Sequence, residues 1–206
     1  MAAKKISGLY AVTPDASAVH GLLQRVEDCL SGGARVIQYR NKNPSAPHRE
    51  IAAALAKMCR QHAATFIVND DVGLALAVRA DGVHLGRDDV DIVSARRQLG
   101  LNRIIGVSCY CSLQTALESQ TAGADYVAFG SMFVSSTKPH APHAPLSLIA
   151  EAKAQLHIPI VAIGGITLQN APQAIAAGAD AVAVVSAVFD AADVRLAAQH
   201  FSNLFN

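Results

Sequence analysis

Gly178-Ala179-Asp180-Ala181-Val182 is the most informative stretch of this sequence, because close variants of it recur along the chain. The variants are Gly32-Gly33-Ala34-Arg35-Val36, Arg79-Ala80-Asp81-Gly82-Val83 and Gly123-Ala124-Asp125-Tyr126-Val127. Each copy precedes a hydrophobic run. Glycine commonly ends a helix in the left-handed region before the chain turns into the next strand. The copies therefore indicate one repeated helix-to-strand unit.

Short runs rich in valine and isoleucine alternate with alanine-rich helical stretches along the whole chain, a pattern typical of βα units on a parallel sheet. We expect eight strands, over residues 8–12, 34–40, 65–69, 82–85, 104–109, 126–130, 158–163 and 181–186. This number of strands in 206 residues predicts an α/β fold, a single (β/α)8 TIM barrel over residues 1–206. A doubly wound open sheet is the alternative. It is disfavoured because Thr13-Pro14-Asp15, and not a glycine-rich turn, follows the first strand.

The composition excludes several classes of protein. With 17 basic and 16 acidic residues the net charge is +1, which gives no overall field to attract nucleic acid or an anionic membrane. The hydrophobic content of 51% excludes disorder, and the apolar runs are too short to span a bilayer. We find no signal peptide and expect a cytoplasmic protein. A homo-oligomer is compatible with the sequence. Apart from one Cys-x-Cys, the cysteines lack metal-ligand spacing, so we expect reduced packing residues at Cys29, Cys59, Cys109 and Cys111.

Functional residues of such barrels lie at the carboxyl ends of the strands. Side chains alternate along a strand, so Gln38, Arg40 and Lys42 share one direction. If they face the mouth, the two cations, which lack a partner in the local sequence, favour a bound anion. A solvated strand end is the alternative.

Asp70 and Asp89 follow two neighbouring strands and predict a Mg²⁺ site, because one or two carboxylates with substrate oxygens and water commonly hold this ion. The alternative is helix capping, which we prefer for Asp71 and Asp88.

A second anion site is predicted on the opposite side of the mouth. Gly164-Gly165 and Val185-Ser186 end neighbouring strands where many barrels bind phosphate through backbone amides; two tight turns are the alternative. The long loop over residues 131–145 is a candidate lid, or otherwise a polar linker, and its Ser135, Ser136, Thr137 and Lys138 suit phosphate oxygens.

Other polar residues receive lesser roles. Ser108 is a candidate hydrogen-bond donor to the mouth, and because we find no histidine placed to activate it, we do not expect a nucleophile. We expect His84 to be a satisfied barrel or interface histidine, and His140 and His143 to face solvent. A metal and cations suit a diphosphate that departs as a leaving group, while the uncharged cradle suits a monophosphate.

The ordered motifs resemble the thiamine-phosphate synthase family of (β/α)8 barrels, from the first strand to the last. They are Gln38-x-Arg40-x-Lys42, Asn69-Asp70, Asp81-Gly82-Val83-His84-Leu85-Gly86 followed by Asp89, Gly106-Val107-Ser108, Ser135-x-Thr137-Lys138, Ile163-Gly164-Gly165-Ile166 and Val185-Ser186. The resemblance implies a transferase that joins 4-amino-2-methyl-5-hydroxymethylpyrimidine diphosphate to a thiazole phosphate or its carboxylated tautomer. The products would be thiamine phosphate and diphosphate.

The resemblance also implies the role of each residue. Asp70 and Asp89 would hold Mg²⁺, and Arg40, Lys42, Ser108 and Lys138 would act on the diphosphate. The pyrimidine diphosphate would be bound by Gln38, Tyr39, Arg40, Asn41, Lys42, Asn69, Ser108 and Lys138, and the thiazole phosphate by Ser135, Ser136, Thr137, Gly165, Val185 and Ser186. The sequence departs from the family pattern at three positions. Tyr39 replaces the usual leucine, but its side chain is expected to point outward from the barrel. Ser135 stands where threonine is common, and Pro145 replaces a frequent glycine. A thiazole tautomerase of the same superfamily and a non-catalytic phosphate-binding barrel are the alternatives; neither needs the metal pair and both cations.

Overall fold

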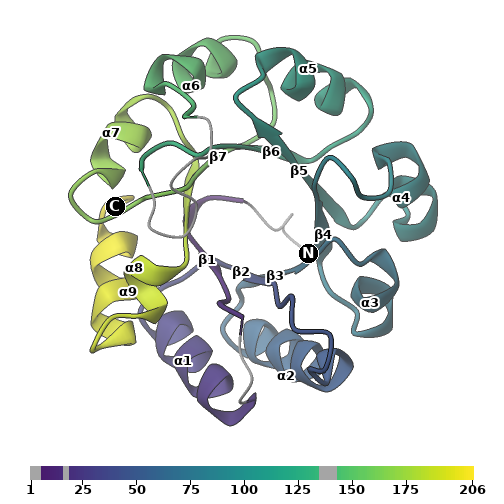
Figure 1. The fold of residues 1–206 in the computed structure, drawn as a ribbon, viewed down its shortest axis with the longest axis vertical. Helices are drawn as coiled ribbons and strands as arrows, with labels where there is room; N and C mark the ends of the chain where they lie inside the picture. Colours follow the sequence, from purple (N-terminus) through teal and green to yellow (C-terminus); the bar gives the residue numbers. More distant parts are fainter. Residues whose placement is uncertain (1–5, 16–18, 135–142) are drawn as a thin grey trace.

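A computed structural model describes residues 6–15, 19–134 and 143–206, and it shows a closed barrel of eight parallel strands in chain order (Figure 1). Each strand pairs with the next, and β8 pairs with β1. The predicted TIM barrel is confirmed, and the strand ends differ from the predicted ones by at most two residues. The strands are β1 (Gly8–Val12), β2 (Val36–Tyr39), β3 (Thr65–Asn69), β4 (Gly82–Leu85), β5 (Ile104–Tyr110), β6 (Tyr126–Phe129), β7 (Ile160–Ile163) and β8 (Ala181–Val184).

The helices form a ring outside the barrel (Figure 1). They are α1 (Val19–Ser31), α2 (His48–Gln61), α3 (Val72–Ala77), α4 (Ile92–Leu99), α5 (Leu113–Thr121), α6 (Leu146–Lys153), α7 (Ala171–Ala176), α8 (Ser186–Phe189) and α9 (Val194–Asn203). Most of the hydrophobic core lies between this ring and the outer face of the sheet. Because both faces of the sheet are covered, the strands are almost wholly buried, as their continuous apolar runs predict.

The repeated junction has two structural functions. Its first residue adopts a positive φ at Arg79, Gly123 and Gly178. Its aspartate then accepts a hydrogen bond from the first residue of the preceding strand, as when the carboxylate of Asp180 accepts from the Ile160 N–H at 2.9 Å. Asp81 and Asp125 bond the second residue of their preceding strands in the same way. In these three copies the motif thus ends the helix and satisfies a backbone N–H near the amino end of a strand.

A smaller cluster of buried hydrophobic side chains fills the barrel interior. Tyr10 and Tyr126 are its largest buried side chains. Gly106 on β5 makes room for one of them, because a Cβ there would overlap the Tyr126 ring. The interior is therefore packed around two phenol groups that lie below the mouth.

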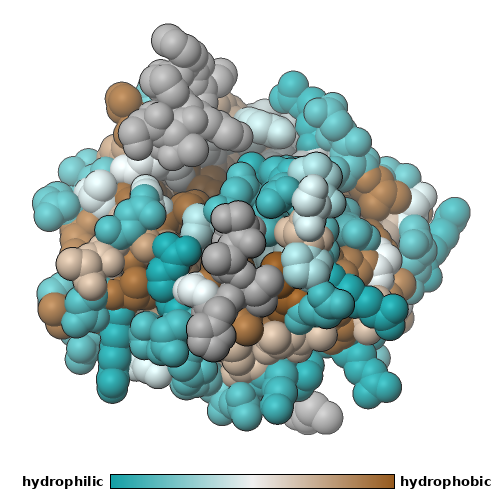
Figure 2. All heavy atoms as spheres, turned by 60° about the horizontal axis from the view of Figure 1, so that its bottom comes forward, coloured by the Kyte–Doolittle hydropathy of each residue, from teal (hydrophilic) through white to brown (hydrophobic). Residues whose placement is uncertain are grey.

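The outer surface is mixed in character. Figure 2 shows hydrophilic residues over most of one face, with hydrophobic residues scattered among them. Among the helices of the described ranges, none has the length and apolar character to cross a membrane. All four cysteines carry free thiols, and Cys29, Cys59 and Cys109 are buried, which confirms their prediction as packing residues.

Candidate active site

The end of β2 separates its side chains between the two faces of the sheet, as the alternation predicts. Gln38 points into the barrel, where its side-chain amide donates to the Tyr10 hydroxyl at 2.8 Å. Tyr39 points outward, and its hydroxyl lies 2.9 Å from Nδ1 of His48 on α2. Asn41 shapes the loop beyond, because its side-chain oxygen accepts from the Asn43 N–H. The Tyr39 side chain therefore lies on the helix side of β2, away from the mouth.

Arg40 and Lys42 have no partner in the local sequence, but each has a carboxylate partner from a distant part of the chain. The Arg40 guanidinium lies 3.4 Å from the Asp15 carboxylate, which also accepts from the backbone N–H of Lys42 at 2.8 Å. The Lys42 Nζ lies 2.6 Å from Asp70. Sequence reasoning missed Asp15. Its position in the loop after the first strand, where barrel sites are built, was the available signal.

Asp70 and Asp89 lie close together, as their neighbouring strands predict. Asn69 pairs with His84 across β3 and β4, and the next residue, Asp70, turns with a φ of 63°. Asp89 accepts from the Gly86 N–H at 2.7 Å, while burial and the Asp70 carboxylate raise its pKa. The two carboxylates and the Lys42 ammonium thus form one partly exposed cluster of charge.

A chain of uncharged side chains crosses the barrel below this cluster. The Tyr10 and Tyr126 hydroxyls lie 2.7 Å apart, and the Tyr126 hydroxyl lies 2.9 Å from Nδ1 of His84. Nε2 of His84 lies 2.9 Å from the Ser108 hydroxyl. A histidine therefore does reach Ser108, a contact that the sequence did not reveal; β4 and β5 are neighbours and bring the two together. His84 is a satisfied barrel histidine.

Burial keeps the side chains of this hydrogen-bond chain uncharged. It lowers the pKa of His84 to about 4 and raises the pKa values of both tyrosines well above their usual range. Tyr10, Tyr126 and His84 thus offer neutral donors and acceptors inside the barrel, whereas the charged cluster of Lys42, Asp70 and Asp89 is partly exposed.

The ends of β7 and β8 form a site of a different kind. The strands pair in register through Ile163 and Ala183, so Gly165 and the Val185-Ser186 pair follow neighbouring strand ends. Gly165 has a φ of 63°, and a Cβ there would meet the backbone carbonyl oxygens of Phe133 and Val134. Only glycine fits this close approach. Val185 and Ser186 are exposed, and the strand ends bring no charged side chain to this side.

Some predicted residues lie elsewhere. Ser135, Ser136, Thr137, Lys138 and His140 lie outside the described residues, whereas His143 is exposed, as predicted. Asp71 caps α3 by accepting from the Leu74 N–H, which confirms that prediction. Asp88 was predicted to cap the next helix, but α4 begins at Ile92, four residues after Asp88, and Asp91 caps it.

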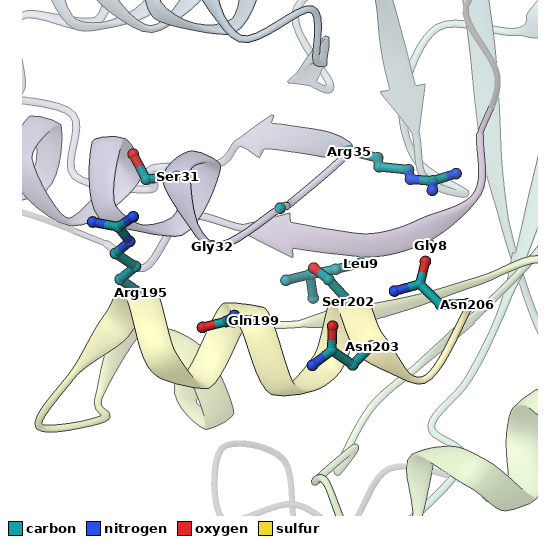
Figure 3. A pocket seen from close by; sticks show the side chains of 11 residues that line it. Gly8, Leu9, Ser31, Gly32, Arg35, Arg195, Gln199, Ser202, Asn203 and Asn206 are labelled. Carbon is teal, nitrogen blue, oxygen red and sulfur yellow. The ribbon is translucent and has the colours of Figure 1, made fainter.

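A pocket of about 390 Å³ lies away from the mouth, at the start of β1 between the end of α1 and α9. Figure 3 shows the side chains of Arg35 and Arg195 at opposite ends of its lining, so their guanidinium groups do not converge on one point. The two arginines therefore do not form one anion site in this pocket.

Taken together, the fold and the mouth define a (β/α)8-barrel enzyme for small phosphorylated molecules, with cations and carboxylates on one side and a glycine-built turn on the other. Residues 9–188 match the sequence model of the family described as thiamine monophosphate synthase. The chain belongs to this family, and the predicted resemblance is confirmed.

Individual relatives agree over nearly the whole chain. It is 53% identical to the thiamine-phosphate synthase of Methylobacillus flagellatus, covering 98% of this chain and 96% of that protein. It is 52% identical to the thiamine-phosphate synthase of Thioalkalivibrio sulfidiphilus, covering 98% and 97%. The solved thiamine phosphate pyrophosphorylase of Pyrococcus furiosus superposes with a TM-score of 0.85 at 38% identity, covering 96% of this chain and 95% of that one.

Proposed function

We propose that this transferase joins 4-amino-2-methyl-5-hydroxymethylpyrimidine diphosphate to a thiazole phosphate, or its carboxylated tautomer, and releases thiamine phosphate and diphosphate, together with carbon dioxide when the carboxylated tautomer is used. The observation that carries the proposal is the 53% identity to a thiamine-phosphate synthase over 98% of this chain. A tautomerase or a phosphate-binding barrel would have no use for the charged half of the mouth.

The pyrimidine diphosphate fits the side of the mouth formed by β2 to β5. Arg40 and Lys42 supply positive charge there, already oriented by Asp15 and Asp70. Gln38, Asn69 and Ser108 would contribute uncharged donors, and Tyr39 and Asn41 would contribute through the backbone of the β2 loop. Lys138 would complete this side. An incoming diphosphate replaces carboxylates as the partner of the cations, so its desolvation is offset by charge-assisted hydrogen bonds.

The residues at the ends of β3 and β4 fit a Mg²⁺ ion. Asp70 and Asp89 present two carboxylates side by side, and the Lys42 ammonium lies against Asp70. Burial and the Asp70 carboxylate raise the pKa of Asp89, so a cation bound there would stabilise its charged form. Two carboxylates with substrate oxygens and water are a common Mg²⁺ ligand set. When bound, the ion would help neutralise the charge of the leaving diphosphate.

The thiazole phosphate fits the side formed by β7 and β8. Gly165 lets the backbone pass close to a ligand, and Val185 and Ser186 follow the neighbouring strand. Ser135, Ser136 and Thr137 would add hydroxyl donors from the adjoining loop. A doubly charged monophosphate held only by neutral groups stays apart from the diphosphate, so the two substrates keep to separate sides.

The reaction then needs no general base. The bond between the pyrimidine methylene carbon and the diphosphate oxygen breaks, and its electron pair stays with that oxygen. Arg40, Lys42 and Lys138 stabilise the negative charge that develops there. The thiazole nitrogen donates its lone pair to the methylene cation, which closes the new C–N bond and leaves a thiazolium.

We place the enzyme in the cytoplasm, where its four free thiols would remain reduced. Its partners are the two small substrates, with no role for nucleic acid or membrane. A homo-oligomer remains compatible with this function.

The direct test is to incubate the protein with both phosphorylated heterocycles and Mg²⁺ and to follow the products by mass spectrometry. We expect thiamine phosphate and diphosphate in equal amounts, and neither when one heterocycle is left out. Interconversion of thiazole tautomers without thiamine phosphate would contradict the proposal in favour of the tautomerase.

A second test concerns the proposed role of Lys138 in the departure of diphosphate. Lys138→Ala should lower kcat far more than it raises KM for the thiazole phosphate. Unchanged kcat with weakened thiazole binding would assign Lys138 to the other side of the mouth.

A further inference from the structure

The hydrogen-bond chain below the mouth runs in one direction. Gln38 begins it as a donor, because the nitrogen of its side-chain amide lies 2.8 Å from the Tyr10 hydroxyl oxygen. Tyr10 accepts that bond, so its own proton is left to donate to Tyr126 at 2.7 Å. A hydroxyl has a single proton, and the buried Tyr10 proton would lack an acceptor if it were not donated to Tyr126, so each link fixes the sense of the next.

The same reasoning assigns the two nitrogens of His84. Tyr126 accepts from Tyr10 and therefore donates to Nδ1 of His84 at 2.9 Å. A neutral imidazole that accepts at Nδ1 carries its proton at Nε2. That N–H points at the Ser108 oxygen, 2.9 Å away. Ser108 is thus the acceptor at the end of the chain.

We propose that this five-residue chain turns the Ser108 hydroxyl so that its proton, and not its lone pair, is presented to the mouth. Ser108 is half-buried at the carboxyl end of β5, and Nε2 of His84 occupies its oxygen from inside the barrel. Its proton is left for an acceptor on the open side. Tyr10, Tyr126 and His84 are therefore positioning residues that act through Ser108.

This arrangement suits an anion and excludes a nucleophilic serine. A histidine that activates serine accepts the hydroxyl proton, whereas His84 donates to the Ser108 oxygen. A donor that is already oriented requires little reorganisation when negative charge develops nearby. The identification of the acceptor as the leaving diphosphate rests on the proposed function, whereas the direction of the hydrogen-bond chain does not.

The packing keeps the chain in place. Tyr10, Tyr126, Gln38 and His84 are all buried, and the Tyr126 ring stacks on the His84 ring with centroids 5.5 Å apart. Gly106 leaves the space that the Tyr126 ring fills. Reversing a single link would leave a buried donor or acceptor without its partner, which is costly.

The first test is nitrogen NMR of the substrate-free protein labelled at histidine, with the His84 signals assigned from their loss in His84→Gln. We expect a bare Nδ1 and a protonated Nε2 at neutral pH. A proton on Nδ1 instead, or on both nitrogens, would overturn the proposal. This measurement needs no turnover, so it can fail while thiamine phosphate is still made, and it can succeed if the proposed function fails.

The second test is a double-mutant cycle on kcat. Tyr126→Phe should lower kcat about tenfold, the effect of one hydrogen bond, but less than about twofold in a Ser108→Ala background, because the chain acts through Ser108. Equal losses in both backgrounds would show a merely structural role and overturn the proposal. Thermal unfolding monitors folding of each variant, and the NMR of the unmodified protein decides the matter should Tyr126→Phe not fold.

Discussion

The two halves of the barrel mouth differ in their chemistry, because charged side chains line one half and a backbone turn forms the other. Beside β2 to β4 lies a cluster of interacting charged side chains, which are Asp15, Arg40, Lys42, Asp70 and Asp89. Beside β7 and β8, the strand ends bring a close backbone turn at Gly165 and a half-buried Gly164. In our proposal, this difference keeps two anions apart in one mouth. Oriented charge suits a leaving group whose charge grows, whereas neutral backbone groups suit a phosphate that does not react.

Removing a carboxylate from the charged half should have the largest effect. Asp70→Asn keeps the shape but removes the charge that holds Lys42 and, in our proposal, Mg²⁺. We expect kcat to fall by about a hundredfold or more, with KM for the thiazole phosphate within about threefold of the parent value. Steady-state kinetics with Mg²⁺ varied measures this. Full activity of the parent enzyme in EDTA, or of Asp70→Asn, would contradict a metal role.

A Cβ at Gly165 should damage the other half alone. Gly165→Ala forces the backbone at Phe133 and Val134 to move, and alanine is strained at a φ of 63°. We expect KM for the thiazole phosphate to rise about tenfold, with KM for the pyrimidine diphosphate little changed.

Gly178→Ala is the matched control for this variant. It also has a positive φ, at 111°, but lies at the opposite end of β8, where the atoms nearest to an added Cβ belong to the Lys153 side chain. It should lower stability without changing either KM. If the two variants changed the kinetics alike, the site would not depend on the turn at Gly165.

Loosening the cations should have a smaller effect on the charged half. Asp15→Asn removes the ionic partner of Arg40 but leaves the guanidinium in the mouth, and an amide oxygen can still accept from the Lys42 N–H. This exposed pair contributes little to stability. We expect KM for the pyrimidine diphosphate to change less than about tenfold, measured beside an unchanged KM for the thiazole phosphate. A larger change for the thiazole phosphate would place Asp15 in the other half.

The smallest kinetic effect should come from the far end of the barrel. Asp180→Ala leaves the Ile160 N–H without its acceptor and removes the partner of Lys153. We expect the free energy of unfolding to fall by about 1–3 kcal/mol, measured by urea denaturation, while kcat and both KM values stay within about twofold. Loss of activity in the fully folded variant would show that the two ends of the barrel are coupled.

Most of the fold could be predicted from the sequence because one unit repeats. The Gly-Ala-Asp junctions and the short apolar runs located all eight strands. The use of the aspartates was not predictable, since the N–H that Asp180 binds lies on the preceding strand. The strand parity placed Gln38 inside and Tyr39 outside correctly.

Contacts across the barrel were harder to predict from the sequence. Arg40 and Asp15 are 25 residues apart, and His84 and Ser108 are 24 apart, so their pairing depends on strand order and register. Nothing in the local sequence marks Tyr10 or Tyr126, because the role of their hydroxyls depends on their contacts with each other and with His84. These missed contacts are the ones that orient the site.

The central claim is that the charged half takes the diphosphate with its metal and the uncharged half takes the monophosphate. Phosphorus NMR with Mn²⁺ in place of Mg²⁺, recorded on the protein with each substrate alone, tests this directly. We predict strong paramagnetic broadening of both diphosphate phosphorus signals and much weaker broadening of the thiazole phosphate signal, with the diphosphate broadening lost in Asp70→Asn. Equal broadening of the two substrates, or broadening that Asp70→Asn leaves unchanged, would contradict the account.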